Sequence, residues 1–446
     1  MSPKKETLFS KRQVDRNFLL VECTPKPRPD AEDSQQAAHA MSARFPEAPI
    51  GRAFLDQARI RLKNVRSFAV MGIRPDFNGQ EVPGSRMAVA LVDAAAALDP
   101  IIQKANGFWG LAGETHLAAA FPGLTPKKAQ KLAIKLQKAV SSPDCSVSVG
   151  IALFPTLDYS PAQVVENAGK ALDHAFLLGA ARIVLFDAVS LNVSGDRYYQ
   201  EGNLELAVAE FEKALQMEKD NENIHNSLGV CLGRTNRMER ALLHFQKALA
   251  LAPESVMPAY NIGLVRMLQN DMDSALAWFD KVLAVEPELY EALVQAGRAH
   301  ANLNRIDEAR ALLEKAASIR PKSTAAHKIL ADMFSDAGIY KEAAKSYSRV
   351  LRIRPNDADS LSRLAWVYTQ MGENAQIAKS FARQSVKLAP DNGLYAFRMG
   401  EILEHWGEPE AALAHFERAL ALGYQCRDTI KELSERLMGS KTKATP

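Results

Sequence analysis

The strongest constraint on the fold is a repeat in the second half of the chain. Pro253, Pro287, Pro321 and Pro355 follow one another at intervals of 34 residues, and each closes a segment with two apolar helical stretches. Proline stops a helix because it lacks an amide donor and its ring clashes with the preceding turn. A two-helix unit of this size cannot bury its apolar face alone, so consecutive units must stack. The pattern therefore predicts an all-α solenoid.

Two recurring sequence steps mark the paired helices. A pair such as Leu228-Gly229 recurs in the first helix, and an Ala-x3-aromatic step such as Ala241/Phe245 recurs in the second. These residues resemble the tetratricopeptide repeat over residues 188–426. We count seven units that begin near residues 188, 222, 256, 290, 324, 358 and 393, and residues 427–446 are expected to form a capping helix and tail. The resemblance implies a protein that binds other proteins.

In tetratricopeptide repeat proteins the first helix of each unit lines a concave groove, and the resemblance places ten residues there. Cations, aromatic rings and amides in this set suit an extended peptide with acidic groups, because arginine pairs with carboxylates and amides hold a peptide backbone. The alternative is a solvated helix face that Asp332 and Glu401 neutralise locally. The candidate groove residues are Asn226, Tyr260, Asn261, Gln295, Arg298, Lys328, Arg363, Trp366, Phe397 and Arg398.

The first half of the chain predicts a separate α+β domain over residues 42–187. The order of the expected elements, βαββαβ with additions, is typical of a ferredoxin-like sandwich. Residues 1–41 are expected to be poorly ordered, because residues 24–36 are rich in proline and polar side chains. Helices are expected at 48–65, 84–102, 125–140 and 161–179, and strands at 67–73, 117–123, 146–155 and 181–187.

Two stretches of this domain, 146–155 and 167–187, resemble the diguanylate cyclase domain, which is known by its Gly-Gly-Asp/Glu-Glu-Phe hairpin. The resemblance implies that Gly72 stands where the family has a metal-binding aspartate, and that Thr115 and His116 stand at the acids of the hairpin. Because two divalent cations need hard carboxylate ligands, we expect a degenerate domain without a catalytic, metal or cofactor site. The other positions that depart from the family are Gln80, Val89, Lys104, Gly107, Glu114, Phe176 and Ala180.

Bulk properties exclude several classes of function. A net charge of +3 is too small to indicate a nucleic-acid partner, and no apolar run reaches the roughly 18 residues of a membrane helix. The four cysteines are scattered without metal-ligand spacing, which favours a reducing, cytoplasmic setting. His116 is expected to be a surface residue of the hairpin, since no third metal ligand is visible near it.

These observations predict a bacterial, cytoplasmic, non-enzymatic adaptor that binds a protein or peptide in the groove, with an acidic segment as a candidate partner. The α+β domain would support self-association or dock another protein. Because residues 184–200 show no flexible linker, we expect this domain and the first repeat to move together. The alternative is a sensor that binds a guanine nucleotide or cyclic di-GMP in the degenerate domain without turnover. Residual cyclase activity is the third hypothesis.

Overall fold

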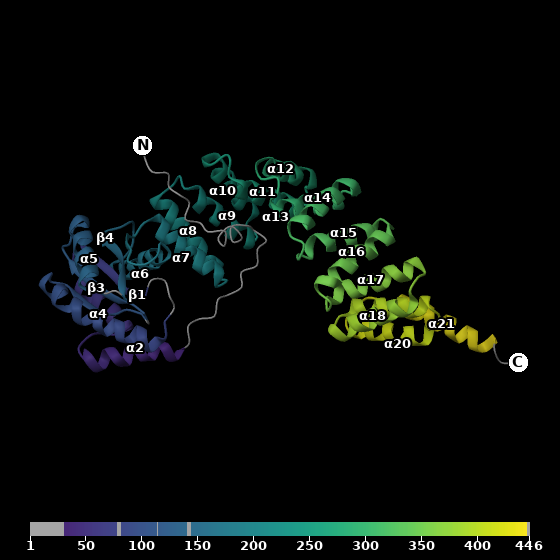
Figure 1. Ribbon diagram of the computed structural model, residues 1–446, viewed down its shortest axis with the longest axis horizontal. Helices are drawn as coiled ribbons and strands as arrows, with labels where there is room; N and C mark the ends of the chain where they lie inside the picture. Colours follow the sequence, from purple (N-terminus) through teal and green to yellow (C-terminus); the bar gives the residue numbers. More distant parts are fainter. Residues whose placement is uncertain (1–30, 78–81, 114, 141–143, 444–446) are drawn as a thin grey trace. The chain divides into compact units, whose positions relative to one another are not determined.

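The computed structural model describes residues 31–77, 82–113, 115–140 and 144–443 (Figure 1). The chain divides into two compact bodies, residues 1–261 and 262–446, which are described separately. The N-terminal body begins with the α+β domain. Its elements are α2 (Ala31–Arg44), α3 (Arg52–Leu62), β1 (Phe68–Asp76), α4 (Gly84–Lys104), β2 (Phe108–Leu111), β3 (Leu117–Pro122), α5 (Pro126–Val140), β4 (Ser146–Phe154), α6 (Pro161–Leu177) and β5 (Ile183–Leu185).

The sheet of this domain has the strand order β2-β3-β1-β4-β5. Strand β1 lies between β3 and β4 and pairs antiparallel with both, and β2 pairs antiparallel with β3. This arrangement of β1 to β4 with α4 and α5 as crossovers is the ferredoxin-like order expected from the sequence. Strand β5 adds to β4 in parallel after the α6 crossover. Strand β2 was not among the expected segments, because four residues are too short for a visible alternation.

Helices cover both faces of the sheet. Helices α4 and α5 pack on one face, and α3 and α6 pack on the other. The close approach of α6 depends on a pair of glycines, Gly72 on β1 and Gly150 on β4, which are register partners. A Cβ atom at Gly150 would lie 2.2 Å from the backbone nitrogen of Leu172 and 2.4 Å from the carbonyl oxygen of Ala168. The helix backbone therefore occupies the space that a side chain at Gly150 would need.

The N-terminal segment is more regular than predicted. The expectation of poor order over 1–41 is wrong for residues 31–41, which belong to α2. Ala37 and Met41 are fully buried, and α2 packs against α4. Burial of these two apolar residues stabilises the helix. The sequence did not indicate this contribution, because the segment as a whole is polar in composition. The rest of the predicted segment lies outside the described residues.

The α+β domain continues into the first repeat without an intervening loop. Helix α7 (Ala188–Gln200) begins directly after Asp187, whose carboxylate accepts a hydrogen bond from the backbone nitrogen of Ser190 at 2.8 Å. Helix α7 packs against α6. Lys170 of α6 donates to Glu210 of α8 (Leu204–Met217) at 2.6 Å, and both side chains are mostly buried. The domain and the first repeats therefore belong to one compact body.

Within the residues that the structure describes, seven helix pairs follow the α+β domain. In five of these pairs a glycine of the first helix packs against a large side chain of the second. For example, a Cβ at Gly229 would lie 2.5 Å from the ring of Phe245, and Gly400 meets Phe416 in the same way. The remaining helices are α9 (Glu222–Arg234), α10 (Met238–Leu251), α11 (Val256–Leu268), α12 (Met272–Val285), α13 (Tyr290–Asn302), α14 (Ile306–Ile319), α15 (Ala325–Asp336), α16 (Tyr340–Ile353), α17 (Ala358–Met371), α18 (Ala375–Leu388), α19 (Gly393–His405) and α20 (Pro409–Ala421).

A last helix, α21 (Arg427–Lys443), packs against α20 at the end of the C-terminal body. Leu433 is 1% exposed, and Ile430 and Leu437 pack against the same apolar cluster. These three residues share one helical face, so α21 covers the apolar surface of the last repeat.

Candidate functional site

The ten predicted groove residues fall into three of the N-terminal body and seven of the C-terminal body. In the N-terminal body Asn226 and Asn261 are buried, and the side-chain nitrogen of Asn261 donates to the side-chain oxygen of Asn226 at 3.1 Å. Tyr260 is 3% exposed. Buried polar side chains that satisfy each other act in packing and offer little surface to a ligand. Asn226 and Asn261 therefore connect the first helices α9 and α11, and the buried Tyr260 offers little surface to a ligand.

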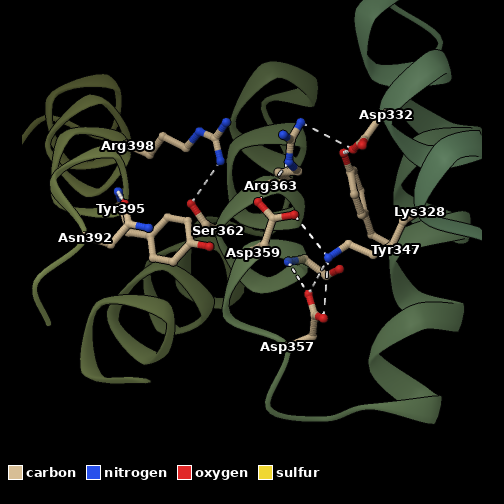
Figure 2. A network of polar contacts seen from close by, with 11 residues as sticks. Lys328, Asp332, Tyr347, Asp357, Asp359, Ser362, Arg363, Asn392, Tyr395 and Arg398 are labelled. Atoms are coloured by element: carbon tan, nitrogen blue, oxygen red, sulfur yellow. Dashed lines mark hydrogen bonds and ion pairs between the residues drawn. The ribbon is translucent and has the colours of Figure 1, made fainter. Parts of the chain in front are cut away.

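In the C-terminal body the predicted residues belong to a polar network that spans α15, α17 and α19 (Figure 2). Its first cation is Lys328 on α15. The Lys328 ammonium lies 3.1 Å from a carboxylate oxygen of Asp357 and 3.2 Å from one of Asp359. Burial of the ammonium opposes its charge, but the two aspartates outweigh this effect and raise the pKa of Lys328.

Asp357 has a second role at the start of α17. Its carboxylate caps the helix by accepting a hydrogen bond from the backbone nitrogen of Ser360 at 2.9 Å. Burial opposes ionisation of Asp357, but the hydrogen bonds from Ser360 and Lys328 prevail and lower its pKa. Lys328 is therefore fixed to the beginning of the next repeat's first helix.

Arg363 on α17 is the second cation of the network. Its guanidinium lies 3.0 Å from Asp359 and 3.3 Å from Asp332. Burial disfavours the charge, but these two carboxylates overcome it and raise the pKa of Arg363. Asp332 in turn accepts a hydrogen bond of 2.5 Å from the hydroxyl of Tyr347, a fully buried side chain of α16. Arg363 is thus tied to both the preceding repeat and its own helix.

Arg398 on α19 is the third cation, and its surroundings differ. Its guanidinium donates to the hydroxyl of Ser362 at 3.4 Å, as Figure 2 shows. In the described part of the chain no carboxylate forms an ion pair with it. Burial, followed by the like charge of Arg363, lowers the pKa of Arg398. Glu401, one turn further along α19, has a raised pKa, mainly because it is buried.

Two aromatic groove candidates are half-buried. Trp366 meets Tyr340 edge-on, with ring centroids 6.0 Å apart. The ring centroid of Phe397 lies 5.3 Å from that of Phe416 and 4.7 Å from that of Tyr424. Their remaining exposed surface lies on first helices, where the sequence placed it. Both side chains also contribute to the packing between helices.

The last two candidates lie on α13. Arg298 is exposed, and within the described ranges no ion pair involves it. Gln295 is half-buried, and its side-chain oxygen is shielded from solvent with no donor among the described residues.

Sequence reasoning missed several residues of the polar network that holds the predicted groove cations. Asp357, Asp359 and Tyr347 were not among the candidates, and only Asp332 and Glu401 were named as neutralising groups. The three cations of the network, Lys328, Arg363 and Arg398, face four carboxylates. A signal was present: Asp357 and Asp359 stand at the N-terminus of the first helix that follows Lys328. Because adjacent first helices lie side by side, residues about one period apart can meet.

Two of the positions compared with the cyclase family, Gly72 and Phe176, pack against neighbouring groups in this structure. Gly72 faces α6, and a Cβ there would lie 3.1 Å from the carbonyl oxygen of Ala168. The ring of Phe176 lies under the guanidinium of Arg74, 4.5 Å from the ring centroid. Asp76 is 3% exposed and accepts a hydrogen bond from Ser148 at 3.3 Å.

His116 differs from its prediction as a surface histidine. Its ring is partly buried and packs against Gly113, where a Cβ would lie 2.5 Å from the ring. Burial and the charge of Arg74 lower the pKa of His116 to about 4, so the imidazole is neutral at pH 7. Among the residues that the structure describes, no group of three or more His, Cys, Asp or Glu side chains could hold a metal ion. Gln80 and Glu114 lie outside the described residues.

Family models match two parts of the second half. Residues 195–236 match a model described as TPR repeat, and residues 266–333 match one described as tetratricopeptide repeat. The chain contains tetratricopeptide repeats. In the described part of the chain, no helix has the length and apolar character needed to cross a membrane.

Several solved structures resemble the repeats. A tetratricopeptide repeat protein from Parabacteroides merdae ATCC 43184 is 22% identical, with a TM-score of 0.44 over 56% of this chain and 98% of that chain. Pseudomonas aeruginosa PilF is 19% identical, with a TM-score of 0.43 over 49% of this chain and 96% of that chain. YrrB, described as a TPR protein with an unusual peptide-binding site, is 22% identical, with a TM-score of 0.36 over 42% of this chain and 95% of that chain. No curated protein matches the chain significantly.

Proposed function

We propose that this chain is a non-enzymatic scaffold whose C-terminal body binds an extended segment of a partner protein on the first helices of its repeats. Tetratricopeptide repeats imply a protein-protein interaction scaffold. The observation that carries the proposal is the polar network that joins α15, α17 and α19. It fixes groove side chains of three successive repeats before any partner arrives. Such preorganisation reduces the entropy that binding would otherwise cost.

The charge balance of the network favours a particular kind of recognition. Its three cations are opposed by Asp332, Asp357, Asp359 and Glu401. A groove with this balance does not attract a partner through a strong positive field. Recognition would instead rest on local contacts, in which Trp366 supplies apolar surface and individual polar groups select the partner's side chains.

The experiment is selection of peptides from a random 12-residue phage library on the immobilised full-length chain. The affinities of the enriched peptides are then measured for wild type and two tryptophan variants. Trp366→Ala should weaken binding by roughly tenfold or more, because buried aromatic anchors carry much of the energy of such interfaces. Trp278→Ala is the matched control, since Trp278 lies on α12, the second helix of its pair. Equal affinity of the Trp366→Ala variant and wild type would refute the groove assignment.

For the α+β domain we propose a docking role without nucleotide turnover, as a degenerate relative of the diguanylate cyclase domain. The absence of turnover is supported by the packing at Gly72, the position where the cyclase family has a metal-binding carboxylate. There the backbone of α6 lies close to the space that a side chain would need. Incubation with GTP and Mg²⁺ or Mn²⁺ should yield no cyclic dinucleotide, and formation of that product would contradict the proposal. The sensor of guanine nucleotide or cyclic di-GMP, self-association through this domain and the bacterial cytoplasmic setting stay predictions from the sequence. Calorimetry with GTP and cyclic di-GMP tests the sensor.

A further inference from the structure

The three cations of the network are not equally available to a ligand. Lys328 contacts the carboxylates of Asp357 and Asp359, and Arg363 contacts those of Asp359 and Asp332. Each of these cations already has two anionic partners within 3.3 Å. A ligand carboxylate that approached them would compete with carboxylates that are fixed in place. Lys328 and Arg363 therefore act as positioning residues that hold α15 and α17 together.

Arg398 has most of its hydrogen-bonding capacity left. A guanidinium carries five N–H donors, and the structure gives Arg398 one bond of 3.4 Å to the neutral hydroxyl of Ser362. The side chain is partly buried, so it has lost water without gaining an anionic partner among the described residues. The positive charge of Arg363 adds repulsion, while Asp359 and Glu401 compensate only at longer range. A carboxylate placed at Arg398 would compensate for both the lost hydration and the repulsion by Arg363.

We infer that Arg398 is the specificity-determining residue of the groove and that it binds a side-chain carboxylate, from Asp or Glu, of the partner segment. The inference rests on the proposed function and names the chemistry of its partner. A chain-terminal carboxylate is the less suitable occupant, because capture of a terminus needs several donors and the other two cations are occupied. Arg398 alone suits a single side-chain carboxylate.

A double-mutant cycle tests this inference with peptides from the library selection described above. We expect an Asp or Glu at one position of the enriched peptides, and the matching Asn or Gln peptide should bind wild type roughly 10- to 100-fold more weakly. The Arg398→Gln variant should bind the acidic and the amide peptide with equal, weak affinity. Arg383→Gln, an exposed arginine on the second helix α18, is the matched control and should keep the wild-type preference. Arg398→Glu should favour Lys or Arg at the same peptide position.

The outcomes separate the two proposals. If peptides are enriched without an acidic position, the groove binds peptides and the role of Arg398 is refuted. If Arg398→Gln retains the full preference for the acidic peptide, the role of Arg398 is again refuted. If no peptide is enriched, or enriched peptides bind the Trp366→Ala variant as well as wild type, the proposed function itself fails. Thermal melting of each variant shows whether a loss of binding reflects a loss of folding.

Discussion

Substituting Gly150 by alanine should severely destabilise the α+β domain. The added methyl group would lie 2.2 Å from the backbone nitrogen of Leu172, 2.4 Å from the carbonyl oxygen of Ala168 and 2.7 Å from the carbonyl carbon of Ala171. Ordinary contacts of a Cβ atom are 3.4–4 Å, so α6 would have to move outward by about 1 Å. All three neighbours are backbone atoms, which cannot rotate away as a flexible side chain can.

The size of the destabilisation follows from the side chains that α6 buries against the sheet. Ala168 and Ala171 are fully buried against the sheet, and Leu172 is 3% exposed. Overpacking in a dense core typically costs 1–3 kcal/mol, and a displaced helix also loses part of its dispersion contacts. We therefore expect the free energy of unfolding of the domain to fall by about 3 kcal/mol or more.

Gly169→Ala provides a matched control on the same helix. A Cβ at Gly169 meets nothing within 4 Å, so the new methyl group has open space. Alanine in a helix interior is more favourable than glycine by roughly 0.5–1 kcal/mol, so this variant should be as stable as wild type or slightly more stable. Chemical denaturation followed by circular dichroism compares both variants with wild type. Equal unfolding curves for the Gly150→Ala variant and wild type would refute the packing argument.

Three further predictions concern buried polar groups. Lys170→Met should lower the free energy of unfolding in urea by roughly 3–5 kcal/mol, because it leaves the Glu210 carboxylate buried without its partner. Adding Glu210→Gln should recover most of this loss. Wild-type stability of the single variant would contradict the prediction. Tyr347→Phe should lower the unfolding free energy by about 1–2 kcal/mol, because Asp332 loses its 2.5 Å hydrogen bond, and an unchanged melting curve would show that this bond contributes nothing. The folded-state pKa of His116 lies below its ordinary value of 6.5, so the unfolded state binds more protons and stability should fall between about pH 6.5 and pH 4. A His116→Gln variant should show a flatter pH dependence over that window, and NMR titration of the imidazole should give a midpoint near pH 4.

The sequence by itself determined the helical half of this protein to within a residue or two. The 34-residue interval between prolines and the pairing of small with large residues recur in successive repeats. These signals can therefore be read from the sequence without knowledge of the fold. Predicted unit starts such as 222, 290 and 393 coincide with the first residues of α9, α13 and α19. The strands of the α+β domain were also predicted from local patterns, such as the apolar run over 67–73 and the alternation over 146–155, apart from β2, which is only four residues long. The helix over 31–44 was missed because its stability comes from packing against α4.

Only the tertiary structure decided how the cations predicted for the groove are paired. Lys328, Arg363 and Arg398 look equivalent in the sequence, because all three are cations of first helices at positions predicted to line the groove. The fold distinguishes them by placing Asp357 and Asp359 beside the first two cations, while Arg398 meets a serine hydroxyl. The physical reason is that the strength of an ion pair depends on distance and burial, which arise from the stacking of neighbouring repeats. Composition and spacing specify the charges, and the stacked helices specify which charges cancel.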